Sequence, residues 1–96
     1  MSVFVAEHTH SGATCPAGNP EMAKGLLAIV SPDNARRRGI TIRGEAVLNG
    51  QHHLYLIVEA SDEKAVRDYF APFGQFGSLT VSSASPCEDV VHRGVC

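Results

Sequence analysis

Two histidines and a cysteine near the start of the chain have the spacing of a metal site, His8-x-His10-x4-Cys15. Two histidines two positions apart on a strand point the same way, about 6–7 Å apart at the backbone, so both imidazoles can meet one ion. Cys15 follows in a glycine-containing segment that can fold back toward them. Two imidazoles and a thiolate suit zinc or copper. A fourth ligand could be Glu59, water or Cys96.

Other roles are open for the same side chains. The histidines could be solvated or hydrogen-bonded residues at a strand end, beside an unrelated buried cysteine. One of them could also be a catalytic acid–base group, because histidine titrates near neutral pH. Cys15 could act as a single nucleophile, activated by His10 or by a helix that begins near Pro20. No second cysteine lies two residues away, so a thioredoxin-type couple is excluded.

A second group of soft ligands ends the chain, Cys87-x4-His92-x3-Cys96. A helical or looped tail could bring these three together. An extended tail of this length spans up to ~30 Å, so Cys96 could also reach the edge that carries His8, or a neighbouring subunit. Alternatively, the tail is a mobile terminus whose cysteines are incidental. A Cys15–Cys87 disulfide is a third interpretation, which opposite positions in the sheet disfavour unless a dimer joins them.

The composition narrows the class of protein. The 96 residues fit one domain, which we place at residues 1–86 with a C-terminal tail at 87–96. A hydrophobic content of 44% favours a globular domain with one face covered in a homodimer. A net charge of −2 argues against nucleic acid as the partner. No apolar run approaches the ~20 residues of a membrane span, and no signal peptide is recognisable. We therefore expect a cytoplasmic protein with reduced thiols.

The apolar periodicity predicts the element order β-α-β-β-α-β. Asn19 is a favourable N-cap before Pro20, and Ser61 is the expected cap of the second main helix. Asn49-Gly50 is the strongest short hairpin signal in the chain. The expected strands are residues 2–10, 40–48, 52–60 and 77–83, and the expected helices begin near residues 20, 32 and 61.

This order of elements resembles the ferredoxin-like fold, and within it the dimeric α+β barrel superfamily of small bacterial proteins. The resemblance covers about residues 2–83. It implies an α+β domain whose four-stranded antiparallel sheet has the strand order 4-1-3-2 and two helices on one face. We expect the first and third strands to run parallel. That would place His8, His10 and Glu59 at one edge of the sheet, and His52, His53 and Cys87 at the other.

Side-chain alternation assigns the strand residues to two faces. We expect the helices to cover Val3, Val5, Ile40, Ile42, Ala46, Leu48, His52, Leu54, Leu56 and Val58. We expect the open face to carry Phe4, Ala6, His8, His10, Thr41, Arg43, Glu45, Val47, His53, Tyr55, Ile57 and Glu59. The rings of His52 and His53 then point to opposite faces, and we interpret them as a solvated hairpin end. Arg43, Glu45 and Tyr55 could line a small-molecule cleft or form cross-strand ion pairs at a dimer interface.

Three functional hypotheses follow. The first is a small cytoplasmic zinc- or copper-binding domain, dimeric through its open sheet face, with the ligands His8, His10 and Cys15 and contributions from Cys87, His92 and Cys96. The second is a cofactor-free isomerase or oxygenase of the dimeric α+β barrel type, with His8 or His10 as the acid–base group. The third is a non-catalytic interaction module. Metal content separates the first hypothesis from the other two.

Overall fold

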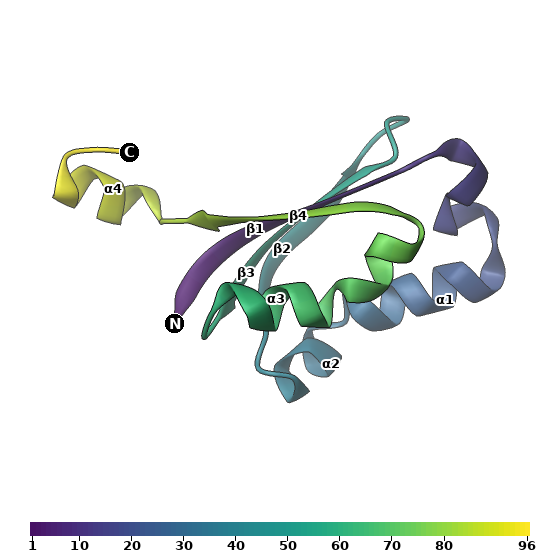
Figure 1. Cartoon of the computed structure of the whole chain (residues 1–96), viewed down its shortest axis with the longest axis horizontal. Coiled ribbons are helices and arrows are strands. Elements are labelled where there is room, and N and C mark those ends of the chain that lie inside the picture. Colours follow the sequence, from purple (N-terminus) through teal and green to yellow (C-terminus); the bar gives the residue numbers. More distant parts are fainter.

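A four-stranded antiparallel sheet forms the centre of the molecule. In the computed structural model, which describes residues Met1–Cys96, its strands are β1 (Ser2–His10), β2 (Thr41–Leu48), β3 (His53–Ala60) and β4 (Gly77–Ala84). The strands lie in the order β2-β3-β1-β4, which reads 4-1-3-2 from the other edge. One face is covered by the helices α1 (Pro20–Ile29), α2 (Pro32–Arg37) and α3 (Glu63–Tyr69) (Figure 1). The predicted α+β class is confirmed.

Every neighbouring pair of strands runs antiparallel, including β1 and β3. The expectation that the first and third strands run parallel is wrong. β3 returns from β2 through a hairpin and inserts between β2 and β1, so it opposes both of them. Thr9 therefore lies opposite His53, whereas Glu59 lies opposite Val3 at the far end of the sheet. The expected grouping of Glu59 with the histidines of β1 is wrong for the same reason.

Polar side chains begin the main helices. The Asn19 side chain accepts hydrogen bonds from the first free backbone N–H groups of α1, at 3.0 and 3.2 Å, as the Asn-Pro sequence predicts. At the start of α3 the cap is Asp62, whose carboxylate accepts from the N–H of Ala65 at 2.8 Å. The prediction of Ser61 as this cap is wrong by one residue. A carboxylate at this position also interacts favourably with the helix dipole.

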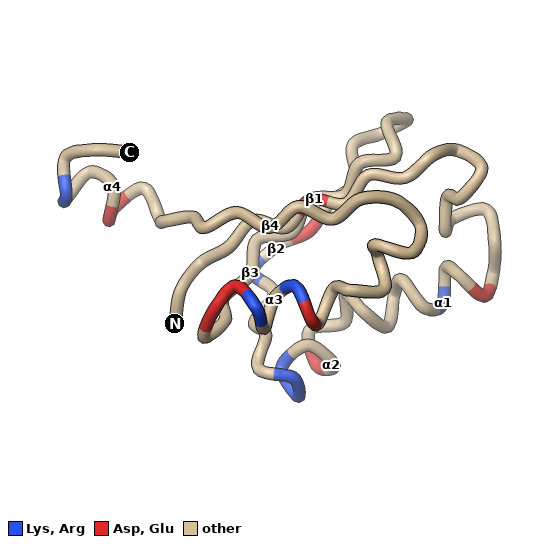
Figure 2. The backbone as a smooth tube through the Cα atoms, in the orientation of Figure 1, with Lys and Arg blue, Asp and Glu red and all other residues tan.

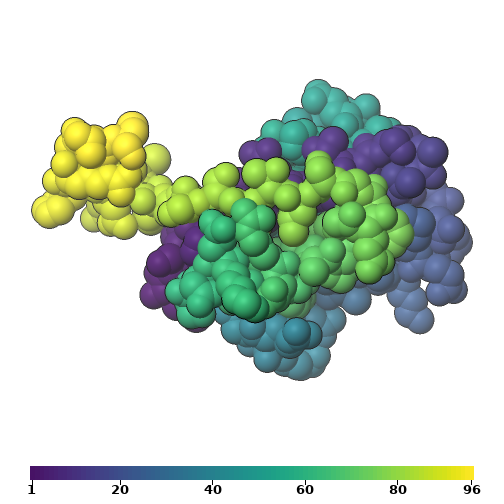
Figure 3. All heavy atoms as spheres, viewed as in Figure 1, coloured from purple at the N-terminus to yellow at the C-terminus, as the bar shows by residue number.

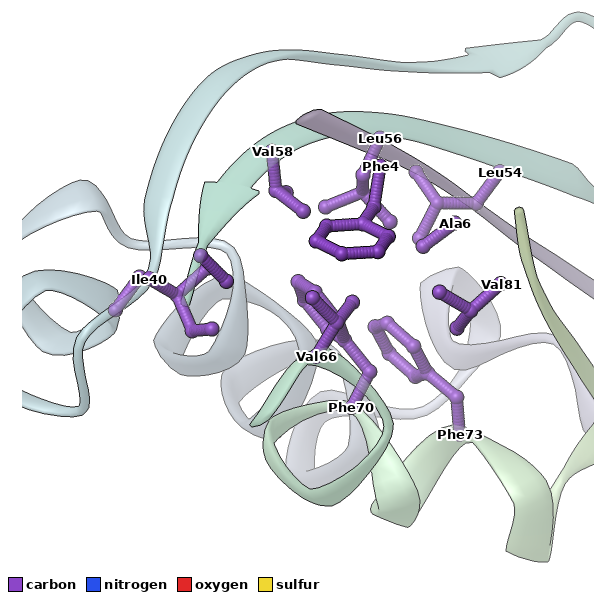
Figure 4. Close-up of a cluster of buried hydrophobic side chains, with 12 residues drawn as sticks. Phe4, Ala6, Ile40, Leu54, Leu56, Val58, Val66, Phe70, Phe73 and Val81 are labelled. Carbon is purple, nitrogen blue, oxygen red and sulfur yellow. The ribbon is translucent and has the colours of Figure 1, made fainter. Parts of the chain in front are cut away.

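The hydrophobic core lies between the sheet and the helices (Figure 4). From the sheet, β3 contributes the apolar set that alternation predicts, Leu54, Leu56 and Val58, each at most 2% exposed. Opposite them lie Phe70, which follows α3, and Phe73 in the 3-10 turn η3 (Ala71–Gln75), with ring centroids 5.8 Å apart. The remaining buried apolar residues are Phe4, Ala6, Ala35, Ile40, Ala60, Val66 and Val81.

The face of β1 that packs on the helices is opposite to the expected one. Phe4, Ala6 and His8 are only 5%, 0% and 1% exposed, while Val3 and Val5 line a groove on the open face. The pairing explains this result, because residues opposite each other in a sheet share a face. Phe4, Ala6 and His8 pair with Val58, Leu56 and Leu54, which already face the helices. Both sides of β1 begin with apolar residues, so alternation alone is ambiguous.

A bulge in β2 changes the face of its second half. Ile42 pairs with Val58, but Gly44 pairs with the next residue of β3, Ile57, so Arg43 is one extra residue. Beyond this point the alternation is inverted: Val47 pairs with Leu54 on the helix side, and Leu48 pairs with His53 on the open side. The expected positions of Glu45, Ala46, Val47 and Leu48 are therefore wrong, since Glu45 pairs with Leu56. An inserted residue of this kind reverses every later position in a strand.

The C-terminal helix α4 (Cys87–Arg93) stands away from the rest of the molecule (Figures 1 and 3). Val91 in this helix and Val95 beyond it are 80% and 68% exposed. The radius of gyration is 14.0 Å, whereas a compact domain of this length would have about 12.5 Å. The structure contains no helix with the length and apolar character needed to cross a membrane.

Candidate metal centre

Three side chains with soft ligand atoms come together where β1 ends. His10 is the last residue of β1, Cys15 lies between the 3-10 turns η1 (Gly12–Thr14) and η2 (Pro16–Gly18), and His52 ends the loop between β2 and β3. Their ligand atoms all lie within 4.8 Å of one another. We call these residues the His10–Cys15–His52 cluster. The spacing in the sequence pointed to His10 and Cys15, and the structure adds His52.

The antiparallel pairing of β1 and β3 brings the two histidines together. One residue beyond the Thr9–His53 pair, the backbone N–H of His10 donates to the carbonyl of His52 at 3.1 Å. His52 has a φ of 52°, in the left-handed region that few residues other than glycine adopt. Its ring meets the His10 ring edge-on, and Nδ1 of His52 lies 3.3 Å from Nε2 of His10. The interpretation of His52 as a solvated hairpin residue is therefore wrong.

Hydrogen bonds after β1 hold Cys15 beside the histidines. The N–H of Thr14 donates to the carbonyl of Ser11 at 3.1 Å, and the N–H of Cys15 donates to the carbonyl of Gly12 at 3.4 Å. The Thr14 hydroxyl donates to the carbonyl of Phe76 at 3.1 Å, which ties this segment to the start of β4. Cys15 is a free, half-buried thiol.

His8 lies behind the cluster, in the core. Its ring stacks on Phe73 with centroids 4.6 Å apart, and on His10 with centroids 5.2 Å apart. Nδ1 of His8 lies 3.0 Å from the carbonyl oxygen of Ser78. A carbonyl can only accept, so Nδ1 carries the proton and donates it, and Nε2 is unprotonated in the neutral ring. His8 and His10 share a face as expected, but His8 supports the His10 ring and is not part of the cluster.

Burial sets the protonation of both stacked rings. It lowers the pKa of His10 below the ordinary value of 6.5, and the neighbouring His8 and His52 rings lower it further. Burial also lowers the pKa of His8, although its hydrogen bond to Ser78 acts in the opposite direction, and His53 adds to the lowering. Both rings are thus neutral at neutral pH. A neutral imidazole is the form that binds a metal ion.

A cavity of about 220 Å³ opens beside the cluster. It lies between the β2–β3 hairpin, the segment that carries Cys15, and the helix α1. In addition to the three cluster residues, its walls consist of Pro16, Ala17, Leu26, Val47, Leu48, Asn49 and Gly50. The space is large enough for an ion and a few ligand atoms or waters, since one water takes up about 30 Å³ in the liquid.

The C-terminal residues proposed as ligands lie elsewhere. Cys87 and His92 belong to α4, and Cys96 follows it. We call residues 87–96 the C-terminal arm, which lies at the opposite end of the molecule from the segment with Cys15 (Figure 1). All three cysteines are free, and Cys87 and Cys96 are exposed. Cys15 and Cys87 are not joined in a disulfide. The structure therefore separates the two groups of soft ligands within one chain.

The polar residues of the open face form separate contacts. Arg43 donates to Glu59 at 2.7 Å, which is a cross-strand ion pair within the chain, whereas the sequence suggested ion pairs of Arg43 and Glu45 at a dimer interface. His53 lies 3.5 Å from Glu7 and stacks on Tyr55 with centroids 4.5 Å apart. These groups belong to the face away from the helices, so they do not contribute to the cluster.

Comparison with known proteins identifies the family of the chain. No curated protein and no solved structure matches it significantly. The model of a family described as a domain of unknown function, DUF3303, matches residues 6–94. The matched range includes all three cluster residues and most of the C-terminal arm. The chain belongs to the DUF3303 family.

Proposed function

We propose that the protein binds one transition-metal ion, zinc or copper, at the His10–Cys15–His52 cluster. The observation that carries the proposal is the convergence of two imidazoles and a thiol from three separate segments within 4.8 Å. A thiolate with two imidazoles is a ligand set that soft and borderline metals prefer. A thiolate requires reduced Cys15, which agrees with the cytoplasmic location expected from the sequence.

The distance between the two imidazoles supports this proposal. Two nitrogens at about 2.0–2.1 Å from one ion are about 3.3–3.6 Å apart in tetrahedral or trigonal geometry. Nε2 of His10 and Nδ1 of His52 are already 3.3 Å apart. Without metal these two atoms share one proton in a hydrogen bond, and an ion would replace that proton. The sulfur of Cys15 lies within 4.8 Å of a ring nitrogen of each histidine.

The contacts of His8 also support a metal site at His10. The ring of His10 is stacked on His8, which is itself fixed by Ser78 and by Phe73. A ligand whose ring is held before binding loses less conformational entropy when the metal arrives. We infer that His8 is a positioning residue for the site.

The acid–base alternative has less support. A cavity of about 320 Å³ lies between α1 and η3 and contains Glu21 and Gln75, but its lining includes neither His8 nor His10. A general base has to reach its substrate within hydrogen-bond distance. His10 lines only the smaller cavity of about 220 Å³, together with Cys15 and His52, and this set of side chains also fits the ligands of a metal ion.

Metal analysis of the purified, tag-free chain tests the proposal. Under reducing conditions the wild type should hold about one equivalent of zinc or copper, since the cluster offers one site. His10→Ala, Cys15→Ser and His52→Ala should each lose it, while His53→Ala on the open face keeps it. Circular dichroism would check that each variant is folded. A wild type without metal after reconstitution, or a Cys15→Ser variant that retains full binding, would refute the proposal.

A further inference from the structure

The surroundings of the cluster are free of charged side chains. None of the ten residues that line the cavity is acidic or carries Lys or Arg. Both segments that supply the ligands are long uncharged stretches, residues 8–20 and 46–58. Figure 2 shows the same pattern, because the hairpin tip between β2 and β3 and the segment between β1 and α1 are drawn entirely in tan. Any charge on a bound ion has to be balanced by its own ligands.

The ligands can balance one positive charge. When a metal binds, the thiol of Cys15 releases its proton to solvent and the thiolate contributes one negative charge. The two imidazoles are neutral. A monovalent ion therefore forms a site with no net charge, whereas a divalent ion leaves one uncompensated positive charge. The apolar walls include Leu26 and Val47, which offer an uncompensated charge no partner, so a divalent ion depends on the solvent that reaches the cavity past Val47, which is 48% exposed.

The number of ligands favours the same ion. Zinc in proteins completes a tetrahedron with a fourth ligand, which here would have to be a water molecule, because the lining of this cavity offers no further histidine, cysteine or carboxylate. Thiolate ligands suit both Cu(I) and zinc, and imidazole ligands suit both copper and zinc, so the number of ligands distinguishes the two ions and the ligand types do not. Two nitrogens and one sulfur from the cluster would complete a three-coordinate site without water.

We propose that the metal of the His10–Cys15–His52 cluster is monovalent copper, bound by two imidazoles and one thiolate in a neutral, three-coordinate site. This inference rests on the proposed function. The reduced, full-length chain is titrated with zinc and with Cu(I) in separate competitions against chromophoric chelators. One equivalent of Cu(I) should displace all of the bound zinc, and X-ray absorption of the copper form should show two nitrogens and one sulfur.

A charge variant tests the reason for the preference. Asn49 lines the cavity in the hairpin, where Asp-Gly is as favourable as Asn-Gly. Asn49→Asp adds a negative charge, which should raise the affinity for zinc roughly three- to tenfold and leave the affinity for Cu(I) within about twofold. The control Asn34→Asp, in α2, should change neither affinity.

The outcomes separate the two proposals. Zinc that resists displacement by Cu(I), or a copper spectrum with a fourth protein ligand or a water, would overturn the copper inference and leave the metal site intact. An equal rise of both affinities in Asn49→Asp would overturn the charge argument on which it rests. Binding of neither metal by the wild type would overturn the proposed function and this inference with it.

Discussion

Gly77 lies at a close approach between β1 and β4, directly opposite His10. A Cβ atom at this position would lie 1.9 Å from the carbonyl oxygen of Thr9 and 3.0 Å from Cα of His10. Both of these atoms belong to the backbone, so no rotation of a side chain can relieve the clash. Gly77→Ala must therefore push the end of β1 away from the start of β4.

The free-energy cost of Gly77→Ala follows from the backbone hydrogen bonds that this movement breaks. The residue pairs involved are Gly77 with His10 and Ser78 with Thr9. Two or three hydrogen bonds, at about 1 kcal/mol each, amount to about 2–3 kcal/mol. Replacing glycine by alanine also reduces the entropy of the unfolded chain, which returns about 0.5–1 kcal/mol. We expect the free energy of unfolding to fall by about 1–2.5 kcal/mol.

Urea denaturation followed by circular dichroism measures this change, with Gly25→Ala as the matched control. A Cβ on Gly25 meets nothing within 4 Å, and the residue lies inside α1. The control should gain about 1 kcal/mol from helix propensity. Because the movement shifts His10, Gly77→Ala should also weaken metal binding. A Gly77→Ala variant as stable as the wild type would refute the close approach of β1 and β4.

Three further predictions concern the core, the pH dependence and the arm. Phe70 is fully buried, so Phe70→Ala should lose about 3–5 kcal/mol in urea denaturation, and a loss under about 1 kcal/mol would contradict its placement. Folding lowers the pKa of His8, so the metal-free protein should lose stability as the pH falls below 6.5. The thermal unfolding temperature of His8→Phe should depend less on pH than that of the wild type. An unchanged pH dependence in this variant would exclude His8 as the cause. We propose that a second copy covers Val91 of α4 and the open-face groove at Ile57, both of which are exposed; light scattering should then find a dimer for the full chain and a monomer for a chain that ends before Cys87, and equal association states would refute this role of the arm.

Local signals in the sequence predicted the elements well, because each depends on a few neighbouring residues. Asn19 before Pro20 marks the start of α1, and its side chain caps the helix as expected. Asn49-Gly50 lies in the hairpin, with Gly50 at a φ of 75°. The apolar alternation of β3 is unambiguous, because Leu54, Leu56 and Val58 form an entirely apolar row, whereas the other face of the strand also carries polar residues. Apart from the cap of α3, which is Asp62 and not Ser61, the positions that failed are those that depend on pairing between strands.

The candidate site also depends on pairing between strands. His10 and Cys15 are five residues apart, so their spacing was visible, but His52 reaches them only through the antiparallel register of β1 and β3. With β1 and β3 parallel, His52 would lie at the opposite edge of the sheet. The register also determines which of the two histidines of β1 can bind a metal ion. It turns both toward the helices, where His8 lies within the core, and only His10, at the end of the strand, is near enough to the surface to share an ion with residues from two loops.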